Sequence, residues 1–217
     1  MYKAGGSHLM IEKREAIQTI IKELSALETI RPEEVPDIAL YMDQVTTFME
    51  DRLKNFRRYD DDKIMTKTMI NNYAKSNLIP SPEKKKYSKD HVLLFILIYY
   101  LKSFLSITDI EKLFSRITED YFNAGEGHYD LQNLYASFCD MVEQSRDDIS
   151  ENILSMLEKE DMAFDGIKED DEGYFHLLAF ILRLSLDVYI KKQLIERLID
   201  RIPEPESRHK KSKSADT

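Results

Sequence analysis

Apolar residues recur at helical spacing along most of the chain, and this pattern predicts an all-α, mainly helical protein. Residues 11–28 place apolar side chains at intervals of three and four, and residues 38–56 repeat the pattern after Pro36, with Asp37 as the expected N-cap. Such spacing gathers the apolar side chains on one face of a helix. Each of these helices therefore needs a partner surface.

Shorter elements with recognisable end signals follow the second helix. Thr66 is expected to cap a helix from Lys67 to about Ser76, because its hydroxyl oxygen can accept a backbone N–H of the first turn. Asn77 stands where a helix ends, since asparagine tolerates left-handed backbone better than most residues. Pro80 and Pro82 prevent the helix from continuing.

A hairpin and two further helices are predicted next. Residues 83–86 are short and polar enough to form a tight hairpin. Ser88 is expected to cap a strongly apolar helix over residues 89–104, and a turn then leads into a helix over residues 108–116.

In the C-terminal half the helical patterns become longer, and they predict a helical hairpin. Residues 131–158 and 174–202 form two long helical patterns, separated by an acidic, glycine-containing loop around residues 168–173. Residues 203–217 contain almost no apolar side chain, so we expect this basic tail to be disordered.

These patterns suggest five parts. The opening residues resemble an expression leader, with Met10 as the natural start. The expected parts are a leader at 1–9, an N-terminal helix at 10–35, a helix-turn-helix domain at 36–118, a helical dimerisation or sensor domain at 119–202, and the tail at 203–217.

Charge is distributed unevenly along the chain. The net charge is −9, yet residues 52–89 contain eleven basic and four acidic side chains, so this stripe is +7 and the remainder −16. A basic stripe in an acidic protein attracts phosphate to one face only, which suits nucleic-acid binding. A solvated helix face followed by a lysine-rich loop gives the same composition.

Composition also bears on location and chemistry. Cys139 is the only cysteine, no signal peptide opens the chain, and the apolar runs are short or interrupted by charge, so we expect a cytoplasmic protein without a membrane span. The five histidines are scattered, and no phosphate loop or nucleophile motif is present. We therefore expect neither catalysis nor a bound cofactor or metal.

The stretch from Thr68 to Ile110 resembles the DNA-binding domain of the MerR family, a winged helix-turn-helix. Tyr73 matches a recognition-helix tyrosine, Asn77 a glycine that ends this helix, and Tyr87 the tyrosine of a short basic wing, while Ser106 and Ile110 match the entry to a later helix. The set is moderately specific because its order and spacing agree together.

A closer resemblance is to the bacterial family called domain of unknown function 1836. Three segments carry it, namely residues 40–45, 66–73 and 85–88, within about residues 36–116. Asn71 and Asn72 stand where MerR proteins have an arginine and a tyrosine, and the wing is shorter.

The resemblance implies a transcriptional regulator that binds double-stranded DNA as a homodimer, with an unidentified small-molecule or protein effector. An asparagine amide can pair with the edge of adenine in the major groove, while lysines reach phosphates. The alternative is a protein-interaction module of the same fold. The expected DNA contacts are Lys67, Thr68, Asn71, Asn72, Lys75, Lys84, Lys85 and Lys86.

Overall fold

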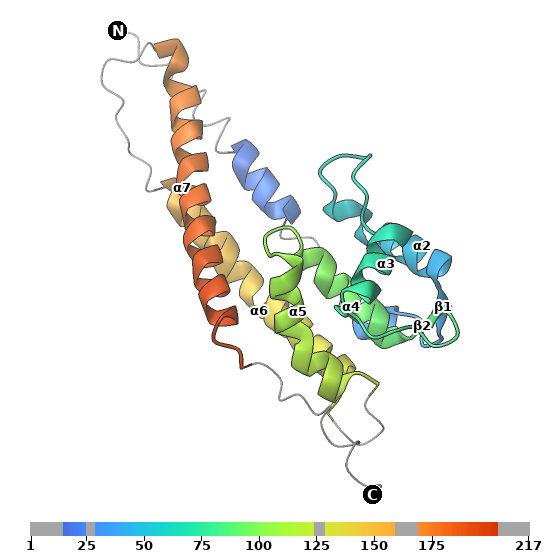
Figure 1. Cartoon of the computed structure of the whole chain (residues 1–217). Helices are drawn as coiled ribbons and strands as arrows, with labels where there is room; N and C mark the ends of the chain where they lie inside the picture. The colour runs from blue at the N-terminus through green and yellow to red at the C-terminus, as the bar shows by residue number, and fades with distance from the viewer. Residues whose placement is uncertain (1–14, 25–28, 124–128, 159–168, 204–217) are drawn as a thin grey trace, which may run out of the picture. The chain divides into compact units, whose positions relative to one another are not determined.

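The computed structural model describes residues 15–24, 29–123, 129–158 and 169–203, and it is mostly helical with one two-stranded sheet (Figure 1). The chain divides into two compact units. We call residues 1–31 with 136–191 the helical unit, and residues 32–135 with 192–217 the hairpin unit. The predicted domain boundary at residue 118 differs from this division, because the hairpin unit continues to residue 135.

The hairpin unit alternates short helices with two very short strands. A 3₁₀ turn at Pro32–Glu34 precedes the first strand, and another at Lys54–Phe56 extends the helix that follows. The strands pair antiparallel, Leu40 with Tyr87 and Tyr41 with Lys86. The main elements are β1 (Leu40–Tyr41), α2 (Met42–Leu53), α3 (Lys67–Lys75), β2 (Lys86–Tyr87), α4 (Lys89–Leu101) and α5 (Ile107–Arg116), followed by a π-helical turn at Ile117–Tyr121.

Helix α4 forms the centre of the core. It is apolar on every side, and every residue from Asp90 to Ile98 is buried. A helix without a polar face must be surrounded by protein. Buried side chains of the same unit include Met49 of α2, Ile70 of α3 and Phe114 of α5.

The predicted N-cap at Asp37 is wrong. Helix α2 begins at Met42, and its N-cap is Tyr41, whose backbone N–H donates to Gln44 Oε1 at 2.9 Å. The reason is tertiary, because Leu40 and Tyr41 are extended to pair with the hairpin strand. Pairing with a distant strand overrides the local helical pattern.

The end signals predicted at Thr66, Asn77 and Ser88 are confirmed, with Ser88 as the N-cap of α4. Thr66 Oγ1 accepts the backbone N–H of Met69 at 3.2 Å, and Asn77 has a φ of 58°. Ser106 caps α5, so this helix begins one residue earlier than predicted. Helix α4 ends at Leu101, three residues before the predicted end.

The helical unit contains a helix at residues 15–24 and most of two long helices, α6 (Leu131–Glu158) and α7 (Glu169–Ile199). The predicted loop at residues 168–173 is wrong for 169–173, which are helical. Residues 169–172 are all acidic, and acidic residues favour the first turn of a helix. The predicted leader lies outside the described residues, as do residue 168 and nearly all of the predicted tail.

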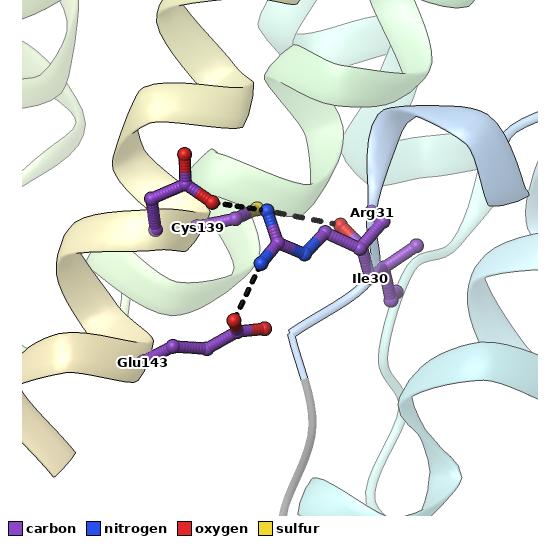
Figure 2. Close-up of polar contacts among 5 residues, drawn as sticks. Ile30, Arg31, Cys139 and Glu143 are labelled. Atoms are coloured by element: carbon purple, nitrogen blue, oxygen red, sulfur yellow. Dashed lines mark hydrogen bonds and ion pairs between the residues drawn. The ribbon is translucent and has the colours of Figure 1, made fainter.

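Arg31, at the end of the N-terminal segment, forms ion pairs with α6 (Figure 2). Arg31 donates to the carboxylates of Asp140 and Glu143, both at 2.5 Å. These hydrogen bonds raise the pKa of Arg31, so it stays charged at any ordinary pH. Beside it, the Cys139 thiol lies 3.7 Å from the Ile30 carbonyl oxygen and is fully buried, which makes it a packing residue.

Candidate nucleic-acid interface

The outward face of α3 is polar along its whole length. Ile70 and Tyr73 point into the core, and burial raises the pKa of the Tyr73 hydroxyl. The five expected DNA contacts on this helix are all exposed, namely Lys67, Thr68, Asn71, Asn72 and Lys75. Helix α3 therefore offers two adjacent amide side chains between two lysines.

The basic stripe predicted at residues 52–89 is partly neutralised by carboxylates. Arg52 pairs with Glu34 at 2.9 Å, Arg57 with Glu50 at 2.6 Å, and Lys67 with Asp43. Lys89 lies 4.0 Å from Asp37 and is only 15% exposed. All four acidic partners lie outside residues 52–89, so the sequence count overstated the available charge of the stripe.

Three of the predicted contact lysines keep their charge available. Within the described part of the chain, Lys75, Lys84 and Lys85 form no ion pair, and all three are exposed. Lys86 is half-buried, with its ammonium 5.0 Å from the centre of the Tyr41 ring. Free positive charge among the predicted contacts is therefore concentrated at the end of α3 and at the tip of the hairpin.

The hairpin tip has an unusual backbone for its sequence. Lys84 has a φ of 49° and Lys85 a φ of 65°, and the Lys86 N–H donates to the Glu83 carbonyl at 2.9 Å. Two positive φ angles in succession are typical of a type I′ turn, for which asparagine and glycine are the usual residues. Each lysine held there costs about 1 kcal/mol or more. The predicted tight hairpin is confirmed, at an energetic cost to the fold.

Both ends of the hairpin are held by a buried histidine on α4. The Ser88 backbone N–H donates to His91 Nδ1 at 3.0 Å, and His91 Nε2 lies 3.2 Å from the Pro80 carbonyl oxygen. Because Nδ1 accepts, the ring proton is on Nε2 and His91 is neutral. Burial lowers the pKa of His91 to about 4. The Tyr87 ring is buried and packs edge-on against His91, so Tyr87 anchors the hairpin to α4.

The neighbouring Asp90 fixes the segment that follows α5. Its Oδ2 accepts the backbone N–H of Asn123 at 2.7 Å, and its Oδ1 lies 3.4 Å from the Gln132 amide nitrogen. Asn123 has a φ of 50°, which places this N–H toward the carboxylate. Burial raises the pKa of Asp90. Asp90 and His91 are thus consecutive buried polar residues with structural partners.

Helix α2 supports both parts of the predicted interface. It contacts α3 and both strands of the sheet. Lys102, at the C-terminal end of α4, donates to the Ile64 carbonyl at 2.7 Å and so fixes the segment that leads into α3. Burial lowers the pKa of Lys102. The polar helix and the lysine hairpin are therefore both fixed to one core.

Sequence reasoning missed the role of His91, which we had grouped with scattered histidines. One signal was present, because Ser88 and His91 have the spacing of a capping box with histidine in the place of glutamate or glutamine. It also missed Asp43 as a partner of Lys67. Of the five histidines, three lie outside the described residues, namely His8, His128 and His209.

The fold and the site define a small helical domain in which a polar helix and a strained basic hairpin are fixed to one buried helix. The chain belongs to the family described as Domain of unknown function (DUF1836), which matches residues 30–138, about half of its length. The match includes α3, the hairpin and the contacts of His91 and Asp90, and it ends before α7. No curated protein and no solved structure matches the chain.

Proposed function

We propose that this chain is a sequence-specific, DNA-binding transcriptional regulator of bacterial, MerR-like type, acting in the cytoplasm. One observation supports it above the others. Lys84 and Lys85, which form no ion pair within the described residues, are held in a strained backbone conformation at an exposed hairpin tip. The core that holds this hairpin also holds α3, whose outer face is wholly polar. Strained backbone at an exposed position is characteristic of functional sites.

In this proposal α3 enters the major groove. The amides of Asn71 and Asn72 read adenine, because an asparagine can accept from N6 and donate to N7 of that base. Lys75 and the hairpin lysines bind phosphates, and this fixes the register of α3 without selecting a sequence. Lys67 contributes once duplex phosphates replace Asp43 as its partner.

The same reasoning predicts how the protein is assembled on DNA. A single helix reads only a few base pairs, so regulators of this kind bind as dimers to half-sites about one helical turn apart. We propose a homodimer, with an effector acting through the helical unit.

Binding to duplex DNA should fall steeply with salt. Each lysine that neutralises a phosphate releases counterions, so the three unpaired lysines predict a slope of log affinity against log salt of about −3 per chain. Fluorescence anisotropy with a labelled random duplex at several salt concentrations measures this slope. Absence of binding at the lowest salt concentration contradicts the proposal.

Replacing Asn71 or Asn72 by alanine should relax sequence preference without weakening the fold. Both side chains are exposed, and alanine has a higher helix propensity than asparagine. Selection of bound duplexes from a random pool should return an adenine-containing motif for the parent chain and a degenerate motif for Asn71→Ala and Asn72→Ala.

A matched variant separates base reading from phosphate binding. Lys85→Ala should weaken binding to all sequences alike and leave the selected motif unchanged. If both asparagine variants unfold, these residues are structural and the assigned role is wrong.

A further inference from the structure

Helix α7 presents more apolar surface to solvent than any other element that the structure describes. Half of the large exposed apolar side chains identified in the described residues are on α7, and they are between 39% and 61% exposed. They are Tyr174, Leu177, Ile181, Leu182, Leu186, Val188, Tyr189, Ile190, Leu194 and Leu198. A helix with this much apolar surface needs cover from protein or lipid.

Part of this surface forms one continuous stripe. At 100° per residue, one face of α7 between Tyr174 and Tyr189 gathers residues spaced by three, four and seven, without any charged side chain; Asp171 and Lys192 lie on the same face beyond its two ends. Phe180, which is buried, lies on the opposite side of the helix. We define the α7 stripe as Tyr174, Leu178, Ile181, Leu182, Ser185, Val188 and Tyr189.

Length and composition alone would also allow α7 to cross a membrane, since Gly173–Ile199 is long and apolar enough. Two charges argue against this. Arg183 and Asp187 lie near the middle of the segment, and each costs about 3 kcal/mol at the centre of a bilayer. The acidic first turn, which includes Asp171, also repels anionic lipid headgroups. Arg183 and Asp187 both lie outside the α7 stripe, so a protein that covered the stripe would leave these charges in water.

We propose that the α7 stripe packs against α7 of a second copy of this chain, in antiparallel orientation. The distribution of charge along the helix decides the orientation. Residues 169–172 are all acidic, whereas the other end has a small excess of positive charge from Lys191, Lys192 and Arg197, even though Lys191 pairs with Asp187 and Lys192 with Glu196. A parallel pair would place two acidic turns side by side. An antiparallel pair places each acidic turn beside the basic end of its partner.

The α7 stripe also has the size and shape of a dimer interface. Its members recur every seven residues, Ile181 with Val188 and Leu182 with Tyr189, which is the repeat of two helices packed along their length. Ser185, a small residue, lies between these pairs and allows the helix axes to approach closely. Specific interfaces bury about 800 Å² per partner. Large apolar side chains along four turns, most of them about half exposed, provide area of that order.

Leu182→Glu combined with Tyr189→Glu tests the interface directly. Both side chains are about 60% exposed, so the folded chain tolerates the change, whereas a buried interface would not accept four uncompensated charges. In sedimentation equilibrium we expect the parent chain to dimerise at micromolar concentration or below. The double variant should raise the dimer dissociation constant at least about 100-fold, with an unchanged circular dichroism spectrum.

Ile149→Glu is the matched control. Ile149 is 58% exposed on α6, so the substitution adds a charge at an equally exposed apolar position outside the α7 stripe. It should leave the dissociation constant unchanged. A monomeric parent chain overturns the proposal, and so does a control that dissociates the dimer as strongly as the double variant.

Cysteine cross-linking tests the orientation even if the charged variant fails to fold. With the two-fold axis between Leu182 and Ser185, Leu178 of one copy lies opposite Tyr189 of the other. Oxidation of a mixture of Leu178→Cys and Tyr189→Cys should give the mixed disulfide dimer, and neither variant alone should cross-link efficiently. Efficient self-linkage of each variant would demonstrate a parallel pair and overturn the orientation.

Flotation with vesicles of phosphatidylcholine and phosphatidylglycerol tests whether lipid, rather than a second copy of the chain, covers the α7 stripe. The parent chain should stay with the soluble fraction, and flotation that the double variant abolishes overturns the proposal. Dimerisation is measured without DNA, so the dimer can be demonstrated even if the chain does not bind DNA. The proposed function is needed only for the further idea that the dimer places two α3 helices on neighbouring half-sites.

Discussion

Lowering the pH from 6.5 to 4 is expected to reduce the free energy of unfolding by about 3 kcal/mol through His91 alone. The pKa of His91 is about 4 in the folded chain, against 6.5 for an unperturbed histidine. Between these values the unfolded chain binds a proton that the folded chain does not, so stability is fully present above pH 6.5 and is lost as the pH falls. Protonation would place an N–H at Nδ1 against the Ser88 N–H, which that nitrogen now accepts.

His91→Gln provides the control for this loss. Glutamine is the usual partner of serine in a capping box, so its side-chain carbonyl can accept the Ser88 N–H without titrating. Urea unfolding at pH 7, 6 and 5 should show a decline in the parent chain that is absent from the variant. An equal decline in both would mean that His91 does not cause it.

Asp90 acts in the opposite direction at lower pH. Its pKa is raised in the folded chain, so its ionisation lowers stability as the pH rises through that folded value. Acidification therefore relieves a cost at Asp90 while it adds one at His91. The difference between the parent chain and His91→Gln isolates the His91 effect, because Asp90 is the same in both.

The local parts of the fold could be predicted from the sequence, because each depends on neighbouring residues. Thr66 caps α3 through a group three residues away, and Asn77 takes its left-handed backbone within a single turn. Long-range pairing could not be predicted in this way. Leu40 pairs with Tyr87, nearly fifty residues later, and this contact moved the start of α2 from the predicted residue 38 to Met42.

In the candidate site, too, some features could be predicted from neighbouring residues and others required the tertiary structure. The outward face of α3 follows from helical periodicity, and the expected DNA contacts on this helix are all exposed. The ion pairs of Arg52, Arg57 and Lys67 require tertiary structure, and a charge count could not show that these cations are neutralised. The positive φ angles at Lys84 and Lys85 contradict the preference of lysine, so only the structure shows the strained tip.

This strain leads to a second large effect, in which stability and DNA binding change in opposite directions. Lys84→Asn combined with Lys85→Gly installs the residues that a type I′ turn prefers, and should raise the free energy of unfolding by about 1 to 2 kcal/mol. The same change removes two exposed, unpaired charges. Affinity for duplex DNA at low salt should fall about tenfold or more, and the salt slope should become shallower by about 2.

Lys63→Asn is the matched control for the hairpin variant. Lys63 is an exposed lysine of the same basic stripe, outside the hairpin and with ordinary backbone φ, so its loss should change neither stability nor the salt slope appreciably. Urea unfolding and anisotropy titrations on the same preparations give both quantities. A hairpin variant that gains stability and keeps full affinity would show that the lysine tip has no part in DNA binding. One that loses stability would show that the tip is not strained, because the conformational cost at Lys84 and Lys85 is the only reason to expect a gain.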